Sequence, residues 1–327
     1  MTILVTGAAG FIGSHVAAAL LDRGESVLGL DNLNDYYPAA LKQARLDRLL
    51  PRPGFHFVKA DIADRAAIEA LAPDFAAATG VVHLAAQAGV RYSLENPYTY
   101  VDANVTGQVA MLEAARRMPS LRHFVYASSS SVYGANRKLP FSVEDRVDSP
   151  MSIYAATKKA SEMMSYAYSH LYGIPATGLR FFTVYGPWGR PDMAAYLFAD
   201  AIMAGRPIRV FNEGRMKRDF TFIEDIVAGV LAALDRPPRP EGGGAPHAVY
   251  NLGNNRTEEL LRFIGLIEAE LGRKAVMQLE PIQPGDVPET SADIAASQRD
   301  LGYRPTTPID VGLPRFVAWY KDYHKIA

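Results

Sequence analysis

The sequence contains no cysteine, and this absence excludes several kinds of chemistry. Without thiols the chain cannot form disulfides, thiolate metal sites or a cysteine nucleophile, and we expect no metal site. The absence also fits a reducing compartment. The first residues, MTILVTG, enter a strand-like run directly rather than a basic head followed by a cleavable apolar segment. We therefore expect a cytoplasmic protein.

Long hydrophobic runs and an excess of one charge are also missing. No apolar stretch reaches the roughly 20 residues that cross a bilayer, and runs such as VVHLAAQAGV are interrupted by polar residues or glycine. The 34 basic and 35 acidic residues nearly cancel, so nothing draws the whole chain toward nucleic acid or an anionic membrane. We predict neither partner. With 327 residues, 49% of them hydrophobic, the chain can bury the core of one large domain or two of ordinary size.

The first half of the chain alternates short β-branched runs with amphipathic segments. The pattern predicts buried strands at TILVTG, ESVLGLD, FHFVKAD, GVVHLAA, RHFVYASS and ATGLRFF. Strands joined by helices with right-handed crossovers indicate an α/β fold, a Rossmann-type doubly wound parallel sheet that binds ligands at the carboxyl ends of its strands. The predicted helices are 11–23, 41–50, 65–71, 101–118 and 154–172.

After about residue 180 the pattern becomes less regular. Short strands at IRVF, AVYNLG and AVMQLEP mix with helices predicted at 194–204, 224–234, 257–271 and 314–324. The stretch RPPRPEGGGAP is rich in proline and glycine and reads as an exposed loop. We therefore predict a nucleotide-binding domain at 1–180 and, at 181–327, mainly a smaller mixed α/β substrate lobe with some segments returning to the first domain.

The motif GAAGFIG follows the first predicted strand and opens the first helix, with glycine at Gly7, Gly10 and Gly13. Glycine lets the backbone turn tightly and approach a pyrophosphate, and the helix N-terminus offers free N–H groups. The spacing alone would also suit tight packing without a ligand. Asp31 ends the second strand, where an acid can accept hydrogen bonds from adenosine ribose hydroxyls and repels a 2′-phosphate. We therefore predict NAD as the cofactor; the alternative is that Asp31 only caps a turn.

Tyr154 and Lys158 lie four residues apart, so a helix places both side chains on one face. An ammonium beside a phenol stabilises the phenolate, which makes tyrosine a usable base. By itself this spacing is more often just an exposed helix face. It gains meaning from the dinucleotide turn and from the strand that ends in the hydroxyls of SSSSVYG.

Together, GAAGFIG, HLAAQAGV, SSSSVYG, YAATK and LRFFTVYGP resemble the extended short-chain dehydrogenase/reductase family over essentially the whole chain. DNLNDYY, AAQAGVRYS, YGPWGRPDMA, GRMKRDFT and GDVPET are similar to the branch of that family that inverts C4 of UDP-glucuronate. The resemblance implies an NAD-dependent epimerase, a UDP-sugar substrate and a homodimer formed through helices 154–172 and 101–118. It further implies that the cofactor contacts are Gly7, Gly10, Phe11, Ile12, Gly13, Asp31, Asn32, Asp61, Ile62, Ala85, Ala86 and Lys158.

The resemblance also implies the catalytic roles. Tyr154 would take the proton of the sugar 4-hydroxyl. Lys158 would lower the pKa of that tyrosine and hold the nicotinamide ribose. The hydroxyl of Ser129 would lie beside the 4-oxygen and complete the proton relay. The C4 hydride passes to NAD, the 4-keto ring turns, and the hydride returns to its other face.

No acid stands within SSSSVYG, and this distinguishes the chain from relatives with further chemistry. Related dehydratases carry Asp-Glu after the position of Ser129, and related decarboxylases carry an acid two residues before the tyrosine of VYG. Ser130 and Ser131 stand there instead, and hydroxyls do not readily exchange protons near pH 7. The comparison favours epimerisation alone, although such serines could also simply bind backbone.

Oxidation of a uronate at C4 gives a β-keto acid, which loses carbon dioxide when the breaking bond aligns with the carbonyl π system. Hydrogen-bond donors that hold the carboxylate so that the breaking bond does not align with that π system would prevent this loss. The candidates are Ser130, Ser131, Thr183 and Arg190, with Arg91 as a second cation; the alternative for Arg190 is a loop-structuring role.

The nucleotide end follows from the same resemblance. Arg218 would contact the diphosphate, with Arg215 and Lys217 as alternatives, and Asp286 would hold the uridine ribose. Gln283 stands where galactose epimerases place an arginine, so other groups must meet the diphosphate charge. Two other functions stay open: a 4-epimerase of UDP-glucose or UDP-N-acetylglucosamine, and a non-catalytic sensor of NAD or nucleotide sugars.

Overall fold

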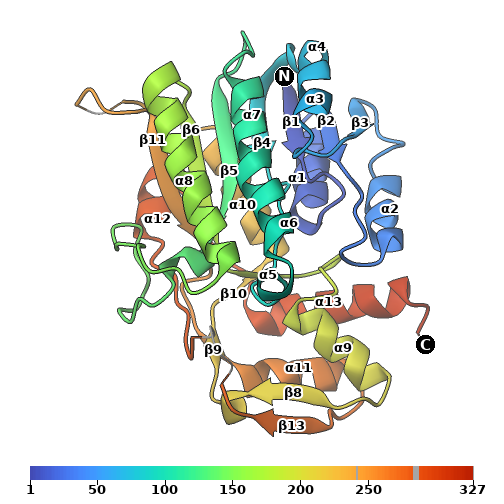
Figure 1. Cartoon of the computed structure of the whole chain (residues 1–327). Helices are drawn as coiled ribbons and strands as arrows, with labels where there is room; N and C mark the ends of the chain where they lie inside the picture. The colour runs from blue at the N-terminus through green and yellow to red at the C-terminus, as the bar shows by residue number, and fades with distance from the viewer. Residues whose placement is uncertain (241, 283–286, 327) are drawn as a thin grey trace.

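The protein is described by a computed structural model that covers residues 1–240, 242–282 and 287–326. A central parallel sheet lies between layers of helices, and a smaller lobe sits below the carboxyl edge of the sheet (Figure 1). The sheet has the order β11-β6-β5-β4-β1-β2-β3. This confirms the predicted Rossmann-type α/β fold. Its strands are β1 (Thr2–Thr6), β2 (Ser26–Asp31), β3 (Phe55–Lys59), β4 (Ala78–His83), β5 (His123–Ser129), β6 (Ala176–Phe181) and β11 (His247–Leu252).

The strand order reverses beside β1, because β2 lies on one side of it and β4 on the other. At such a reversal the loops that leave neighbouring strands diverge, and a crevice opens at the carboxyl ends of the strands. Both faces of β1 are buried: Ile3 and Val5 join one hydrophobic core, and Leu4 joins the other. The continuous apolar run of the first strand therefore reflects burial on two sides.

The seventh strand, β11, was predicted from AVYNLG, but its position in the sheet was not. It pairs in parallel with β6, from His247 opposite Ala176 to Leu252 opposite Phe181. A segment from the second half of the chain therefore returns to the central sheet. The division at residue 180 itself stays a prediction.

Helices cover both faces of the sheet. α1 and α10 lie together on one face, and α3, α7 and α8 lie on the other (Figure 1). The helix predicted at 101–118 is interrupted, since a π-helical turn, η1 (Asp102–Thr106), precedes α7. The helices around the sheet are α1 (Phe11–Asp22), α2 (Ala39–Asp47), α3 (Arg65–Ala70), α4 (Ala72–Phe75), α5 (Tyr92–Glu95), α6 (Pro97–Val101), α7 (Gly107–Ala115), α8 (Ile153–Tyr172), α10 (Ile223–Leu234) and α12 (Ala295–Leu301).

The smaller lobe is built on the parallel pair β8 and β13 and on α9, α11 and α13 (Figure 1). The last helix was predicted to begin at Pro314, but α13 begins at Ile309, because burial of Ile309 and Leu313 outweighs the hydrogen bond lost at the proline. No helix within the described ranges is both long and apolar enough to span a bilayer. The remaining elements are η2 (Ser130–Tyr133), β7 (Thr183–Tyr185), α9 (Ala194–Met203), β8 (Ile208–Phe211), η3 (Asn212–Gly214), β9 (Lys217–Arg218), β10 (Phe220–Phe222), β12 (Glu258–Glu259), α11 (Leu260–Leu271), β13 (Met277–Glu280) and α13 (Ile309–Tyr323).

Candidate active site

A cavity of about 1600 Å³ lies between the carboxyl edge of the sheet and the smaller lobe. It brings together residues from both halves of the chain, and each role assigned to them stays a prediction. Asp286 and Gln283 lie outside the described residues. Apart from the alternatives Arg215 and Lys217, every other predicted site residue is on the wall: Gly7, Gly10, Phe11, Ile12, Gly13, Asp31, Asn32, Asp61, Ile62, Ala85, Ala86, Arg91, Ser129, Ser130, Ser131, Tyr154, Lys158, Thr183, Arg190 and Arg218.

The glycine-rich turn brings bare backbone to one end of this cavity. Gly7 has φ +73°, a conformation that favours glycine, and a Cβ built on Gly13 would lie 2.0 Å from the carbonyl oxygen of Gly7. The N-cap of α1 is Gly10, which has no side chain to occupy the N–H groups of the first turn. These residues fit a dinucleotide, whose pyrophosphate needs close backbone approach and N–H donors.

The carboxylate of Asp31 supports this turn and also faces the cavity. Its Oδ2 accepts from the N–H of Ala9 at 3.1 Å, and its Oδ1 accepts from the N–H of Leu33 at 2.8 Å. Since each carboxylate oxygen can accept more than one hydrogen bond, capacity remains for ribose hydroxyls. Asp61 also faces the cavity while it accepts a hydrogen bond from the protein, since its Oδ2 accepts from Asn32 Nδ2 at 2.9 Å. Turn-capping and ribose binding are therefore compatible at Asp31.

Replacing Gly13 by alanine is expected to remove most of the bound NAD, because the new methyl group would collide with the backbone of Gly7. The measurement is the NAD released per protein chain after denaturation, together with the free energy of unfolding. The control is Gly265→Ala in α11, where a Cβ would meet no atom within 4 Å. That variant should retain NAD and gain about 0.4–1 kcal/mol of stability. A normal NAD content in Gly13→Ala would contradict the assignment.

The start of α8 carries the predicted base. Ser152 caps the helix by accepting the N–H of Ala155 at 3.1 Å, which places Tyr154 in the first turn at the cavity wall. The Nζ of Lys158 donates to the carbonyl oxygen of Ala127 at 2.9 Å, and burial lowers the pKa of this lysine to about 8. Burial raises the pKa of Tyr154, while the hydroxyl of Ser129 and the charge of Arg190 oppose that rise. The predicted effect of Lys158 on the phenol stays a prediction.

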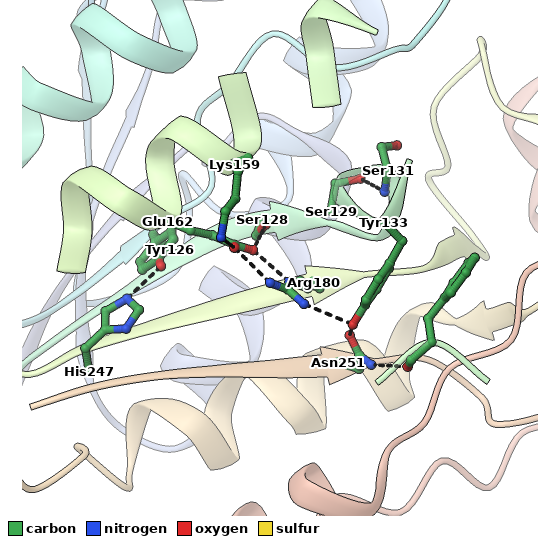
Figure 2. Close-up of polar contacts among 11 residues, drawn as sticks. Tyr126, Ser128, Ser129, Ser131, Tyr133, Lys159, Glu162, Arg180, His247 and Asn251 are labelled. Carbon is green, nitrogen blue, oxygen red and sulfur yellow. Dashed lines mark hydrogen bonds and ion pairs between the residues drawn. The ribbon is translucent and has the colours of Figure 1, made fainter. Parts of the chain in front are cut away.

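The serines after β5 have different partners. Ser129 Oγ accepts the N–H of Ser131 at 3.1 Å, so its hydroxyl proton remains able to donate (Figure 2). Ser128, one residue earlier, is buried and donates to Glu162 Oε1 at 2.7 Å. Ser128 thus joins the end of β5 to α8, and Ser129 lies on the cavity wall.

Glu162 belongs to a buried polar network that the sequence reading missed (Figure 2). Arg180 Nε donates to Glu162 Oε1 at 2.8 Å and Arg180 Nη2 to Glu162 Oε2 at 2.9 Å, with side-chain exposures of 4% and 3%. Arg180 Nη1 also donates to the Tyr133 hydroxyl at 3.1 Å, and that hydroxyl donates to Asn251 Oδ1 at 2.7 Å. The network joins α8 to β5, β6 and β11. No local spacing in the sequence indicates this network, because Arg180 lies 18 residues from Glu162 and meets it only through the fold.

Arg190 does not stand alone on the wall. Its Nε donates to Asp192 Oδ1 at 3.0 Å, its Nη2 binds Asp192 Oδ2, and the Tyr36 hydroxyl donates to the same Oδ2 at 3.1 Å. The charge of Arg190 holds the pKa of Asp192 below its usual range against burial. Neither Asp192 nor Tyr36 was predicted, although both stand in motifs quoted for the family resemblance.

Cations line the other end of the cavity. Arg218 lies on the wall and donates through Nη1 to the carbonyl oxygens of Lys217 and Pro288 at 2.9 and 3.1 Å. The Arg91 guanidinium lies 4.6 Å from the ring centroid of Phe211. Arg206 and Arg209, which the sequence reading did not select, also reach the wall, whereas the alternatives Arg215 and Lys217 are not among its described lining residues. This end suits an anionic group such as a diphosphate.

Comparison with known proteins gives consistent matches. Residues 3–253 match the NAD dependent epimerase/dehydratase family. The chain is 50% identical to UDP-glucuronate 4-epimerase 4 of Arabidopsis thaliana, with 99% of this chain and 76% of that protein covered. It is 47% identical to a probable UDP-glucuronate 4-epimerase of Rhizobium meliloti (strain 1021), with 100% and 99% covered. The UDP-glucuronic acid 4-epimerase of Bacillus cereus, solved with UDP-glucuronic acid and NAD, superposes with a TM-score of 0.88 at 35% identity, with 99% and 100% covered.

Proposed function

This chain belongs to the NAD dependent epimerase/dehydratase family, and we propose that it interconverts UDP-glucuronate and UDP-galacturonate by inversion at C4. NAD is the cofactor, and the enzyme is an isomerase. One observation carries the proposal. Tyr154, Lys158 and Ser129 line one cavity. The same cavity is lined by Arg190 and by Ser130 and Ser131, which stand where related enzymes carry acids. That set can move a proton at a sugar hydroxyl and bind a carboxylate, and the relatives named for this activity match along the full chain.

Bound NAD supplies the acceptor for the C4 hydride and its donor on return. The chain manages the proton. Tyr154 Oη takes the proton of the 4-hydroxyl as the C4–H bond breaks, and Ser129 donates a hydrogen bond to the same sugar oxygen. The ammonium of Lys158, held by the carbonyl of Ala127, favours the phenolate. After the 4-keto ring has turned, Tyr154 returns the proton to O4, and no external redox partner is consumed.

The carboxylate of the substrate needs separate handling. Ser130, Ser131, Thr183 and Arg190 lie on the same wall as Tyr154 and offer donors that can hold the bond between C5 and the carboxylate in the plane of the 4-keto carbonyl group. In that orientation the bond to carbon dioxide does not align with the carbonyl π system. With serines in place of acids, the strand end has no carboxylic acid that could exchange a proton near pH 7 to support elimination or to complete a decarboxylation.

Incubating the purified protein separately with UDP-glucuronate, UDP-glucose and UDP-N-acetylglucosamine, without added NAD, tests the proposal. We expect UDP-galacturonate from UDP-glucuronate and no pentose product. Inversion of a neutral sugar alone would establish the rival epimerase activity. Bound NAD without any conversion would establish the non-catalytic sensor.

We further propose that the protein is a cytoplasmic homodimer. Support for the dimer comes from exposed apolar side chains on α8, including Met163, Tyr166 and Leu171. Covering them with the same helix of a second copy would bury apolar surface symmetrically. The division into 1–180 and 181–327 also belongs to this proposal, with β11 as the segment that returns to the sheet.

A further inference from the structure

Arg190 is already paired with a carboxylate that belongs to the protein. Its Nε and Nη2 bind the two oxygens of Asp192 side-on, and both side chains lie on the cavity wall with exposures of 22% and 28%. A guanidinium binds a carboxylate best through two parallel N–H groups. A substrate carboxylate that seeks this edge of Arg190 must therefore displace Asp192.

Asp192 has a second anchor that would remain after such a displacement. The Tyr36 hydroxyl donates to its Oδ2 at 3.1 Å. Gly89, at φ +105°, makes room for this contact, because a Cβ there would lie 2.6 Å from the Tyr36 hydroxyl oxygen. Asp192 would thus keep one hydrogen-bond donor while Arg190 is engaged elsewhere, which lowers the cost of separating the pair.

The backbone around Arg190 is held independently of its side chain. Arg45 is buried in α2 and donates through Nη2 to the carbonyl oxygens of Trp188 and Gly189 at 2.7 and 3.2 Å. Its Nη1 donates to the carbonyl oxygen of Ala9 in the glycine-rich turn at 3.1 Å. An exchange of partners at Arg190 therefore needs only side-chain rotation, since the loop is tied to the cofactor end.

The reaction requires such an exchange. The ring has to turn between removal and return of the hydride, and its carboxylate travels with it. A guanidinium that never released the carboxylate would hold the ring in one orientation. Resting on the proposed function, we propose that Asp192 competes with the substrate carboxylate for Arg190, so that Arg190 binds the uronate before and after the turn and returns to Asp192 during it.

Two variants of the NAD-loaded enzyme should shift uronate binding in opposite directions. Asp192→Asn keeps the shape but removes the competing charge, so the Kd for UDP-glucuronate should fall about 5- to 10-fold while kcat falls by a similar factor. Tyr36→Phe removes the anchor that Asp192 needs when Arg190 leaves, so the Kd for UDP-glucuronate should rise several-fold. Neither change should alter the Kd for UDP-glucose, which has no carboxylate.

The Kd values are measured by calorimetry in a Tyr154→Phe background, where turnover does not interfere, and kcat is measured with Tyr154 intact. The control is Asp148→Asn, because Arg146 and Asp148 form an exposed pair with the same spacing, away from the described cavity wall. It should change neither constant. If Asp192→Asn weakens binding of both nucleotides alike, Asp192 only builds the loop and the proposal is overturned. Failure of the proposed function is a separate result, namely an enzyme with intact Tyr154 that does not convert UDP-glucuronate.

Discussion

Replacing Tyr154 by phenylalanine is expected to lower kcat for UDP-glucuronate epimerisation by about 10²- to 10⁴-fold while NAD remains bound. Phenylalanine preserves the aromatic ring, which lies 6.0 Å from the ring of Tyr100, and removes only the oxygen that exchanges the proton with O4. Lys158 and the glycine-rich turn are unchanged, so the cofactor contacts persist. The measurements are UDP-galacturonate formed, by chromatography, and NAD released on denaturation.

Tyr166→Phe is the matched control, because Tyr166 lies on the same helix with about half of its surface exposed. It should epimerise at the normal rate. If Tyr154→Phe retained near-normal activity, another group would have to accept the proton. If it lost NAD, the tyrosine would instead be part of the cofactor site, and the loss of activity would say nothing about proton transfer.

Much of the fold could be predicted because the inner strands of the central sheet are buried on both faces and therefore read as nearly continuous apolar runs. β11 was recognised as a strand, but its position in the sheet was not predicted. It is an edge strand with only Asn251 and Leu252 fully buried, and its local sequence does not indicate which strand it pairs with. The π-helical turn of η1 was not predicted, because the helical period continues through it. Local patterns thus indicated the elements but not their partners.

The residues of the site also fall into those that local patterns predict and those whose partners only the fold reveals. Tyr154 with Lys158, and the glycine-rich turn, could be predicted because their members are close in sequence and their spacing has a direct meaning. Asp192 was missed although it stands two residues after Arg190. Its importance depends on Tyr36, which is 156 residues away and reaches it only through the fold. A charged residue whose partner is distant in sequence looks like any surface residue until the fold is known.

Glu162→Leu is expected to lower the free energy of unfolding by about 3–5 kcal/mol, because it leaves the Arg180 guanidinium buried without its counter-charge. The same change removes the acceptor of Ser128, whose neighbour Ser129 faces the substrate cavity. The measurement is urea unfolding. The control is Asp22→Ala, which breaks the exposed pair with Arg52 and should cost no more than about 1 kcal/mol.

Adding Arg180→Met to Glu162→Leu separates stability from positioning. With both charges gone, no buried ion is left unpaired, and the double variant should recover most of the lost stability. Ser128 still lacks its acceptor on α8, so the end of β5 is less firmly held against the helix that carries Tyr154. We expect the recovered protein to bind NAD yet epimerise about tenfold more slowly, since small misplacements of reacting groups are costly. A double variant that is stable and fully active would show that the network serves folding alone, and a single variant as stable as the original would show that Glu162 and Arg180 do not depend on each other.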